Sequence, residues 1–365
     1  MRMRSACKAQ SRYLSGIMEA IKLTQFSKGG GCGCKIAPSV LQQILQTNTT
    51  HNFPNLLVGN ESADDAAVYA LDDDNAIIST TDFFMPIVDD PFDFGQVAAA
   101  NAISDVYAMG GKPLMAVAIL GWPVDKLPAE TAQRVLDGAR EKCREAGMPL
   151  AGGHSIDSSD PIFGLAVTGT VRREHLKQNN TAKAGDYLFL TKAVGVGVLS
   201  TAMKRGLLQP EHYDVLIKQL TALNSAGEAL GKISGVHAMT DVTGFGVLGH
   251  LTEMAEGSGV SAEMNYAALP KIAGLETYLA QRTVPDATSR NWNSYSSKVQ
   301  FAKGLNVMEA FNVLPDPQTN GGLLIAVAEE ALEEVKKVLR EAGLENFTEP
   351  VGRLVEKSEK VLYVL

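Results

Sequence analysis

The sequence contains an alanine-rich stretch that decides the predicted fold, Phe92-Asp-Phe-Gly-Gln-Val-Ala-Ala-Ala-Asn-Ala-Ile-Ser-Asp-Val-Tyr-Ala-Met109. It ends at Gly110-Gly111, and Pro113 follows shortly after. Alanine favours the helix, while glycine and proline commonly mark a helix end, so we predict a helix from Phe92 to Met109. Its residues are apolar on most sides, which predicts that the helix is buried.

Strands are expected on both sides of this helix. Two strand-like runs, Ala66–Leu71 and Ala76–Phe84, precede it and are joined by a polar turn of three aspartates and Asn75. Beyond the helix, the pattern predicts a buried strand at Leu114–Leu120, an amphipathic helix at Ala129–Ala146 and a strand at Phe163–Val171.

The second half of the chain repeats this alternation of strands and helices. A charged stretch, Arg172–Lys183, is a plausible domain boundary. Beyond it we expect strands at Tyr187–Thr191, Leu323–Ala328 and Val361–Leu365, and helices at Gly197–Arg205, Glu211–Ile233 and Glu330–Ala342. Residues 281–298 are polar and rich in serine and asparagine, which predicts a long loop. The pattern indicates a two-domain, mixed α and β architecture.

Composition narrows the classes of function. The 365 residues carry a net charge of −8 without a basic stripe, so we expect no nucleic-acid partner. No stretch approaches the roughly 20 apolar residues that span a membrane. The four cysteines include Cys32 and Cys34, which are too close for an ordinary disulfide, so we expect a reducing compartment, the cytoplasm. Residues 1–20 are expected to be a disordered extension.

The run Gly31-Cys32-Gly33-Cys34-Lys35 is the first candidate for chemistry. A lysine beside a cysteine favours the thiolate, which is the reactive form, and the many glycines predict a mobile segment without packing of its own. A Walker A loop is excluded, because Ile36 follows the lysine where serine or threonine is required. Half of a metal site, or a plain flexible turn, explains the run equally well.

Carboxylates form the second group of candidates. Asp64 and Asp65 come just before a strand, Asp82 ends one, Asp105 lies in the alanine-rich helix, and Asp241 follows Thr240. A carboxylate on a buried helix is costly unless it is compensated, and a divalent cation is the usual compensation. Mg²⁺ takes oxygen ligands, typically one or two protein carboxylates together with substrate phosphates. Taken singly, each aspartate is also explained by a solvated turn or a helix cap.

Two glycine-rich stretches complete the set. Gly152-Gly153-His154-Ser155 follows a short apolar piece and predicts a turn whose backbone N–H groups hold a phosphate or a purine edge. A plain loop histidine is an equally good account of His154. The run from Asp316 to Gly322 predicts a tight turn, for which the sequence offers no chemistry.

Together these segments resemble the selenophosphate synthetase family. The most specific match is Leu23-Thr-Gln-Phe-Ser-Lys-Gly-Gly-Gly-Cys-Gly-Cys-Lys-Ile-Ala-Pro38. Further matches are Ser62–Val68, Ser79–Pro86, Asn101–Asp105, Met109–Pro113, Gly152–Ser155, Thr240–Gly246 and Asp316–Gly322. The resemblance covers residue 21 to the end, and nothing is carried over to residues 1–20.

The resemblance implies a role for each candidate. Cys32 matches the catalytic cysteine, and Lys35 matches the lysine that meets the ATP phosphates. The implied magnesium ligands are Asp65, Asp105 and Asp241, and the implied nucleotide contacts are Lys35, Asp64, Asp82, Asp105, Gly153, His154 and Ser155. It also implies a two-domain α/β (α+β) fold of the aminoimidazole ribonucleotide synthetase type, with mixed sheets.

The implied organisation has a flexible catalytic loop at residues 21–37, an ATP- and Mg²⁺-binding domain at 38–171 that forms a homodimer, and a C-terminal α/β domain at 172–365. The implied reaction converts ATP, selenide and water into selenophosphate, AMP and phosphate, which supplies selenium for selenocysteine and selenouridine. A selenium-delivery protein is a possible partner. The alternatives are another ATP-using synthetase or small-molecule kinase of the same superfamily, or a thiol protein that stores metal or selenium.

Overall fold

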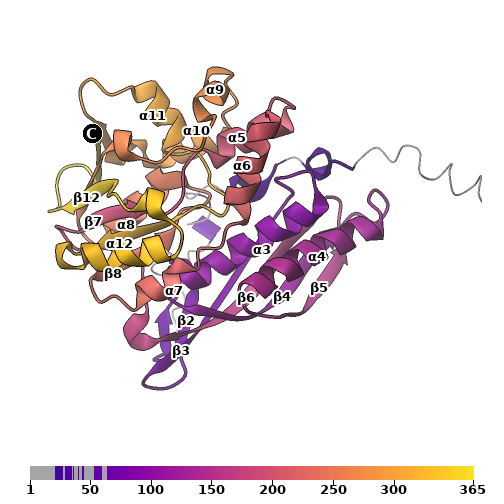
Figure 1. Ribbon diagram of the computed structural model, residues 1–365, viewed down its shortest axis with the longest axis horizontal. Coiled ribbons are helices and arrows are strands. Elements are labelled where there is room, and N and C mark those ends of the chain that lie inside the picture. The colour runs from indigo at the N-terminus through magenta and orange to yellow at the C-terminus, as the bar shows by residue number, and fades with distance from the viewer. Residues whose placement is uncertain are drawn as a thin grey trace, which may run out of the picture.

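The computed structural model describes residues 21–27, 29–34, 36, 40, 43–44, 53–59 and 64–365. These residues form two mixed β-sheets with helices packed against them, and the α/β fold class is therefore confirmed (Figure 1). The first sheet takes its strands from residues 56–172 and the second from residues 187–364. The predicted boundary stretch, Arg172–Lys183, lies between the last strand of one sheet and the first strand of the other.

The first sheet has the strand order β1-β2-β3-β6-β4-β5. Its strands are β1 (Leu56–Val58), β2 (Ala67–Ala70), β3 (Asn75–Phe84), β4 (Lys112–Trp122), β5 (Leu150–Asp157) and β6 (Ile162–Arg172). Only β4 and β5 pair in parallel among these strands; the other neighbours are antiparallel. The predicted hairpin is confirmed, since Ala70 pairs with Ala76 across the aspartate turn.

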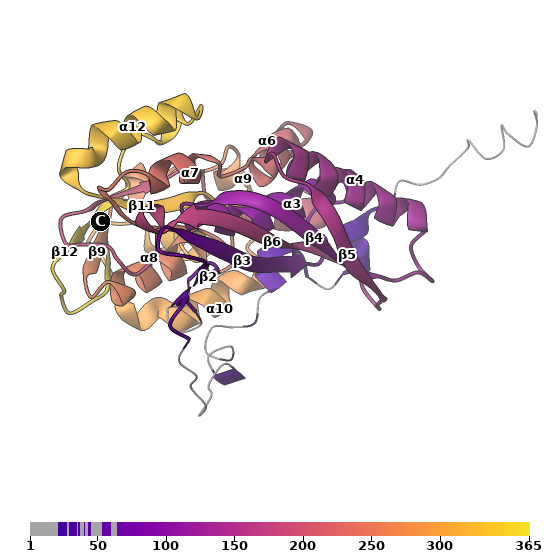
Figure 2. The same cartoon turned by 90° about the horizontal axis from the view of Figure 1, so that it is seen from below.

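Helices α3 (Pro91–Ala108) and α4 (Ala129–Glu145) lie along one face of this sheet, as Figure 2 shows. Both helices are confirmed within a residue or two of the predicted ends. Their backbones approach closely at two glycines. A Cβ on Gly95 would lie 1.8 Å from the carbonyl oxygen of Val135, and one on Gly138 would lie 1.9 Å from that of Phe92. Only glycine fits at either position, so α3 is held firmly against α4.

The opposite face of the first sheet is not covered by the part of the chain that the structure describes. In β4, Ala116 is buried under the helices, but Leu114, Met115 and Val117 are 51%, 43% and 41% exposed. The prediction of a fully buried strand at Leu114–Leu120 is therefore wrong. A continuous apolar run does not distinguish a strand covered on both faces from one whose second face is left open.

The second sheet has the strand order β10-β13-β9-β12-β7-β11-β8. Its strands are β7 (Tyr187–Leu190), β8 (Val236–Asp241), β9 (Ser261–Met264), β10 (Val299–Phe301), β11 (Leu323–Val327), β12 (Gly352–Val355) and β13 (Leu362–Val364). Every residue of β11 is buried, because its side chains point alternately into two hydrophobic clusters on the two faces. The predicted strands that correspond to β7, β11 and β13 are confirmed.

Helices surround the second sheet. They are α5 (Val196–Lys204), α6 (Pro210–Thr221), α7 (Ala226–Gly231), α8 (Gly246–Gly257), α9 (Leu275–Ala280), α10 (Asp286–Tyr295), α11 (Val307–Val313) and α12 (Leu332–Glu341). The predicted helices in this half are confirmed, with the stretch 211–233 divided between α6 and α7. None of the helices in the described ranges is both long and apolar enough to cross a membrane.

The long loop predicted at residues 281–298 is wrong, because α10 and a 3-10 turn, Ser296–Lys298, occupy most of it. The polar composition was misleading. Asn291 is buried and donates hydrogen bonds to the carbonyls of Gly244 and Pro315, while Trp292 stacks on Phe301. Amide side chains that satisfy loop carbonyls therefore replace the apolar stripe that marks most helices.

Candidate active site

Helix α3 supplies three polar side chains to the space between the two sheets. Asn101, Ser104 and Asp105 are buried and lie on one helical face, since they are three and four residues apart. Two of them contact β3 and one contacts β8: Asn101 Nδ2 donates to Asp82 and Asp105 Oδ2 accepts from Thr80 Oγ1, both in β3, while Ser104 Oγ donates to Asp241 Oδ2 in β8 at 2.6 Å.

Four of the predicted aspartates come together around this face. Asp64 and Asp65 precede β2, Asp105 lies in α3, and Asp241 ends β8. Burial raises the pKa of Asp65 well above its usual value, and the charges of Asp241, Asp64 and Asp105 raise it further. Burial also raises the pKa of Asp64 to about 6, against the opposing effect of hydrogen bonds from backbone N–H groups of Asp65 and Asn179. The cluster therefore repels itself when it is ionised.

The donor set fits a divalent cation. Thr240 Oγ1 donates to Asp65 Oδ1 at 2.9 Å, but Asp65 Oδ2 is buried with no hydrogen-bond partner among the described residues. Such an oxygen is costly to bury, and a cation both satisfies it and cancels the repulsion. In the described ranges no three His, Cys, Asp or Glu side chains form a ready-made metal cage. This is compatible with Mg²⁺, which usually takes few protein ligands and completes its shell with water and phosphate.

A pocket of about 500 Å³ opens beside the aspartates. Its walls come from β2, β3, β6 and the segments that lead into them, and they are formed by Gly59, Asp64, Asp65, Ala66, Ala67, Ser79, Thr80, Thr81 and Ala166. The volume is in the range of pockets that hold a nucleotide-sized ligand. The pocket places two carboxylates and two threonine hydroxyls at the disposal of such a ligand.

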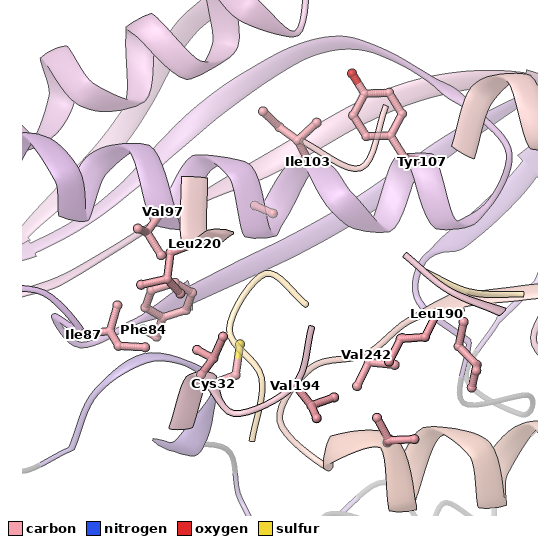
Figure 3. Packing of buried hydrophobic residues seen from close by; sticks show 14 of the residues in the cluster. Cys32, Phe84, Ile87, Val97, Ile103, Tyr107, Leu190, Val194, Leu220 and Val242 are labelled. Atoms are coloured by element: carbon pink, nitrogen blue, oxygen red, sulfur yellow. The ribbon is translucent and has the colours of Figure 1, made fainter. Parts of the chain in front are cut away.

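Cys32 lies in a packed segment. It belongs to a 3-10 turn, Gly31–Cys34, is 3% exposed, and is part of the buried hydrophobic cluster that also contains Phe84, Ile87, Val194 and Leu220 (Figure 3). Gly31 N donates to the carbonyl of Met85 at 3.0 Å, and Cys32 N donates to Thr319 Oγ1 at 3.0 Å. The expectation that this segment lacks packing of its own is therefore wrong for residues 29–33.

The thiol of Cys32 points toward α3. Cys32 Sγ donates to Asn101 Oδ1 at 3.2 Å, and the same oxygen accepts the N–H of Asn320 at 2.7 Å. The other end of the amide donates to Asp82, whose carboxylate can only accept, so the orientation of Asn101 is fixed. Lys35 and the side chain of Cys34 lie outside the described residues.

The structure does not bring Gly153, His154 and Ser155 to the aspartates of the same chain. The predicted turn is wrong: these residues belong to the exposed edge strand β5, at the far end of the sheet from β1 and β2. Gly153 pairs with Ala118 of β4, and a Cβ on it would lie 2.5 Å from the Ala118 carbonyl oxygen. Gly153 therefore allows β5 to pair closely with β4. Because glycine is used both in turns and at such close strand contacts, the sequence pattern predicted a turn here instead of a strand.

Several site residues escaped the sequence analysis. Thr80, Ser104 and Thr240 each donate to one of the aspartates. The available signal was their position, since Ser104 and Thr240 each come one residue before a candidate aspartate and Thr80 comes two residues before Asp82. The run Asp316–Gly322 is more than a turn, because Gln318, Thr319 and Asn320 are buried and contact residues from both halves of the chain.

Lys192 is a buried cation near this network. Its Nζ donates to the carbonyls of Ala222 at 2.8 Å and Asn320 at 2.9 Å. Burial lowers its pKa to about 7, although the charge of Asp241 opposes the shift. Lys192 thus ties Asn320, and through it Asn101, to the second sheet.

Comparison with known proteins gives two levels of similarity. The N-terminal domain of AIR synthase related proteins matches residues 63–171, and their C-terminal domain matches residues 183–364. The selenide, water dikinase of Pseudomonas putida is 54% identical over 348 residues, which cover 95% of this chain and 99% of that protein. The Escherichia coli K12 protein of the same name is 55% identical over 337 residues, 92% of this chain and 95% of its own.

Solved structures of more distant proteins share the fold. Thiamine-monophosphate kinase from Stenotrophomonas maltophilia has a TM-score of 0.62 at 19% identity, with 85% of this chain and 91% of that one covered. Hydrogenase maturation protein HypE in complex with ATP has a TM-score of 0.61 at 16% identity, with 94% and 93% covered. At these identities the likeness concerns the fold alone.

Proposed function

Because the chain belongs to the selenide, water dikinase family of AIR synthase related proteins, we infer that it uses ATP to convert selenide into selenophosphate. It is an enzyme, and its products with ATP, selenide and water are selenophosphate, AMP and phosphate. The observation that carries this function is the identity of about 55% over nearly the whole chain. The thiamine-monophosphate kinases and HypE proteins in the structural comparison are only 16–21% identical to it, so the alternative of another superfamily enzyme is not favoured.

We propose that Asp65, Asp105 and Asp241 hold Mg²⁺, and that Asp64 joins them at the phosphates of ATP. The support is the shared burial of these carboxylates and the unpartnered oxygen of Asp65. When bound, Mg²⁺ neutralises charge on the triphosphate. The protein's own contribution is positioning: Thr80, Ser104 and Thr240 each fix one carboxylate by a hydrogen bond.

We propose that Cys32 is the catalytic thiol and that Lys35 meets the ATP phosphates. Asn101 accepts the thiol hydrogen and is itself oriented by Asp82, so Asp82 acts on Cys32 through Asn101. Asp82 is therefore assigned to the positioning of the thiol as well as to the nucleotide contact implied by the resemblance. A buried, apolar surrounding excludes water from the thiol, which protects an easily oxidised selenium species.

We further propose a homodimer that forms through the open face of the first sheet. Tyr69, Phe83, Met115, Val117 and Ile156 are each at least 41% exposed there, an apolar surface that is unusual for a monomer. Ser79, Thr81 and Ala166 line the ATP pocket. Ser79 and Thr81 lie in the same strand as Phe83, four and two residues before it, and Ala166 pairs with both Thr81 and Val117. A second copy on this face would bring its β5, with Gly153, His154 and Ser155, toward the pocket. These residues could then contact the nucleotide bound by the other copy, although they lie far from the aspartates of their own chain.

The place of action also remains a proposal. We place the enzyme in the cytoplasm, because a reactive thiol at Cys32 and a reduced selenium substrate both require a reducing compartment. A selenium-delivery protein is proposed as a partner on the same ground, since free hydroselenide oxidises readily. No nucleic-acid partner is proposed, given the net charge of −8.

Product analysis tests the function. The purified protein with ATP and Mg²⁺ should release AMP and phosphate in equal amounts only when selenide is present. Release of ADP with a different acceptor, or AMP formation that ignores selenide, would favour the alternative kinase. Binding of selenium or metal without any ATP turnover would favour the storage protein instead.

A further inference from the structure

A second pocket, of about 550 Å³, borders the Cys32 segment. It shares no wall residue with the pocket beside the aspartates. Its walls come from four places: the glycines of residues 29–33, the segment Met85–Ile87 after β3, the last two turns of α5, and the first turn of α10. Thr319, which accepts the N–H of Cys32, also lines it. Cys32 is joined to Asp82 through Asn101 on one side and, on the other, to Thr319, a wall residue of the second pocket.

The second pocket carries positive charge. Three cationic side chains line it, Lys204, Arg205 and Arg290, against one carboxylate, Asp286. Among the described residues, no carboxylate lies within ion-pair distance of any of the three, whereas ten other lysines and arginines form ion pairs. Asp286 lies in the first turn of α10, where the helix dipole offsets its charge. The field in the pocket is therefore positive in a protein of net charge −8.

Two of these cations bind backbone carbonyls on either side of Cys32, at Ser27 and Gly33. Lys204 Nζ donates to the carbonyl of Ser27 at 3.0 Å, and Arg290 Nη2 donates to that of Gly33 at 3.0 Å. A carbonyl satisfies one N–H of each cation but leaves its charge uncompensated. The remaining N–H groups of both side chains are thus available to an anion that lies beside the segment.

We propose that this pocket binds a small inorganic anion, either the hydroselenide substrate or the orthophosphate product. The proposal rests on the proposed function and adds a second substrate or product site to it. Both are small anions, and the positive charges of Lys204, Arg205 and Arg290 can bind either of them. The pocket is larger than either ion, so the ion keeps part of its hydration shell. Arrival on this side leaves the nucleotide pocket free for ATP.

The sharpest test adds a negative charge to the pocket and leaves the hydrogen bonds of Lys204 and Arg290 to the backbone near Cys32 intact. Ser200 lines the pocket, and its hydroxyl donates within its own helix to the Val196 carbonyl. Ser200→Asp places a negative charge in the pocket, and Ser200→Asn is the neutral control of the same shape. We expect Ser200→Asp to raise the KM for selenide, or the inhibition constant of orthophosphate, about five- to tenfold, from like-charge repulsion at partial screening. Ser200→Asn should stay within about twofold of the parent in both, as should the KM for ATP in both variants.

Charge removal provides a second measurement. Lys204→Gln and Arg290→Gln should raise the same constant about tenfold each, the usual loss for one charge-assisted contact. Lys360 and Arg173 also donate to backbone carbonyls, Ser297 and Asp72, but elsewhere on the surface. Lys360→Gln and Arg173→Gln are therefore the matched controls and should leave both constants unchanged.

The outcomes separate the two sources of the anion. A change in the selenide KM alone assigns the pocket to hydroselenide, and a change in phosphate inhibition alone assigns it to orthophosphate. The proposal is overturned if Ser200→Asp behaves like Ser200→Asn in both the selenide KM and the phosphate inhibition constant. It is also overturned if Lys204→Gln and Arg290→Gln lower kcat alone, because the two cations then only hold the backbone near Cys32 in place. If the parent makes no selenophosphate, the proposed function fails. Calorimetric titration of the parent and Ser200→Asp with orthophosphate and with hydrosulfide then still decides whether the pocket binds anions.

Discussion

Cys32 and Asn101 are 69 residues apart in the chain, yet Cys32 Sγ donates a 3.2 Å hydrogen bond to Asn101 Oδ1. Asn101 lies one helical turn before Asp105 in α3. One turn of one buried helix therefore contacts the thiol at one end and the aspartate cluster at the other. This relationship gives the first prediction.

Replacing Cys32 by Ser should abolish selenophosphate formation while ATP still binds. Serine keeps the donor to Asn101, and no aspartate is altered, but its hydroxyl is a far weaker nucleophile than a thiol. We expect turnover to fall at least about 10³-fold, with the Kd for ATP within about twofold of the parent. Selenide-dependent AMP release and equilibrium ATP binding measure the two effects.

Cys34→Ser is the matched control and should be mild. Lys35→Ala should also lower turnover, by about 10²–10³-fold, through lost stabilisation of phosphate charge. Full activity in Cys32→Ser together with a dead Cys34→Ser would show that the other cysteine is the catalytic one.

Asn substitutions at Asp65, Asp105 or Asp241 should lower Mg²⁺-dependent ATP turnover at least about 100-fold, because each removes a charge that the cation requires. Without Mg²⁺, Asp65→Asn should unfold at a higher urea concentration than the parent, since it relieves the repulsion from Asp241, Asp64 and Asp105. Turnover against Mg²⁺ concentration and urea midpoints check both. A variant with normal turnover at ordinary Mg²⁺ would remove that residue from the metal site.

Mixing two inactive variants tests the proposed dimer. Asp65→Asn damages the aspartate cluster, and His154→Ala damages β5 at the other edge of the sheet. If each site combines the aspartates of one copy with β5 of the other, a randomly mixed population has one intact site in each mixed dimer. Activity should then return to about a quarter of the parent value.

The two variants are unfolded together and refolded as a mixture, and selenide-dependent AMP release is measured. Each variant refolded alone is the control. No recovery from two inactive variants would place both residues in one chain's site, and a fully active His154→Ala would remove His154 from the nucleotide contacts.

Asp316 should make stability depend on pH. Burial raises its pKa to about 8, despite hydrogen bonds from Gln318 and the backbone N–H of Gly197. The folded protein then holds this proton more tightly than the unfolded chain, whose pKa is near 3.8. The stabilising contribution is complete below pH 4 and is lost as pH rises toward 8, a loss of a few kcal/mol.

Urea midpoints between pH 5 and pH 9 check this contribution. Asp316→Asn should show a flatter pH dependence than the parent, while Asp214→Asn, at an exposed position, should keep the parent's slope. An unchanged slope in Asp316→Asn would rule Asp316 out as its source.

Removal of residues 1–20 should leave turnover within about twofold of the parent, because a terminal segment outside the family match is expected to make few contacts. The shortened chain and the full chain are compared by selenide-dependent AMP release and by thermal unfolding. A lower midpoint or a lost activity would show that the extension belongs to the folded unit.

Local patterns predicted most of the fold. The aspartate turn before Asn75 fixed a hairpin, and the alanines of α3 together with Gly110 fixed a helix and its end. Both signals depend only on residues that are close in the sequence, so they predict the hairpin and the helix without knowledge of the tertiary packing. Helix α10 escaped prediction because its buried Asn291 is satisfied by carbonyls of residues 244 and 315, which no local pattern reveals.

The candidate site was predictable in its residue types but not in its connections. Taken singly, Asp65, Asp105 and Asp241 were also explained by a solvated turn or a helix cap, and the family resemblance singled them out as metal ligands. Their supporting hydroxyls, such as Thr240 and Ser104, depend on which elements meet in space. For Gly153, the sequence did not distinguish a turn from a strand that approaches its neighbour closely, because glycine serves both.

The hydrogen bond from Cys32 N to Thr319 Oγ1 joins residues 287 positions apart. A ribosome that adds about 5–20 residues per second needs roughly 15–60 s to make the chain between them. During that interval the thiol has left the ribosome, while the residue that anchors its backbone does not yet exist. The burial of Cys32 is therefore among the last events of biosynthesis, and until then the newborn chain needs reducing surroundings to keep this thiol intact.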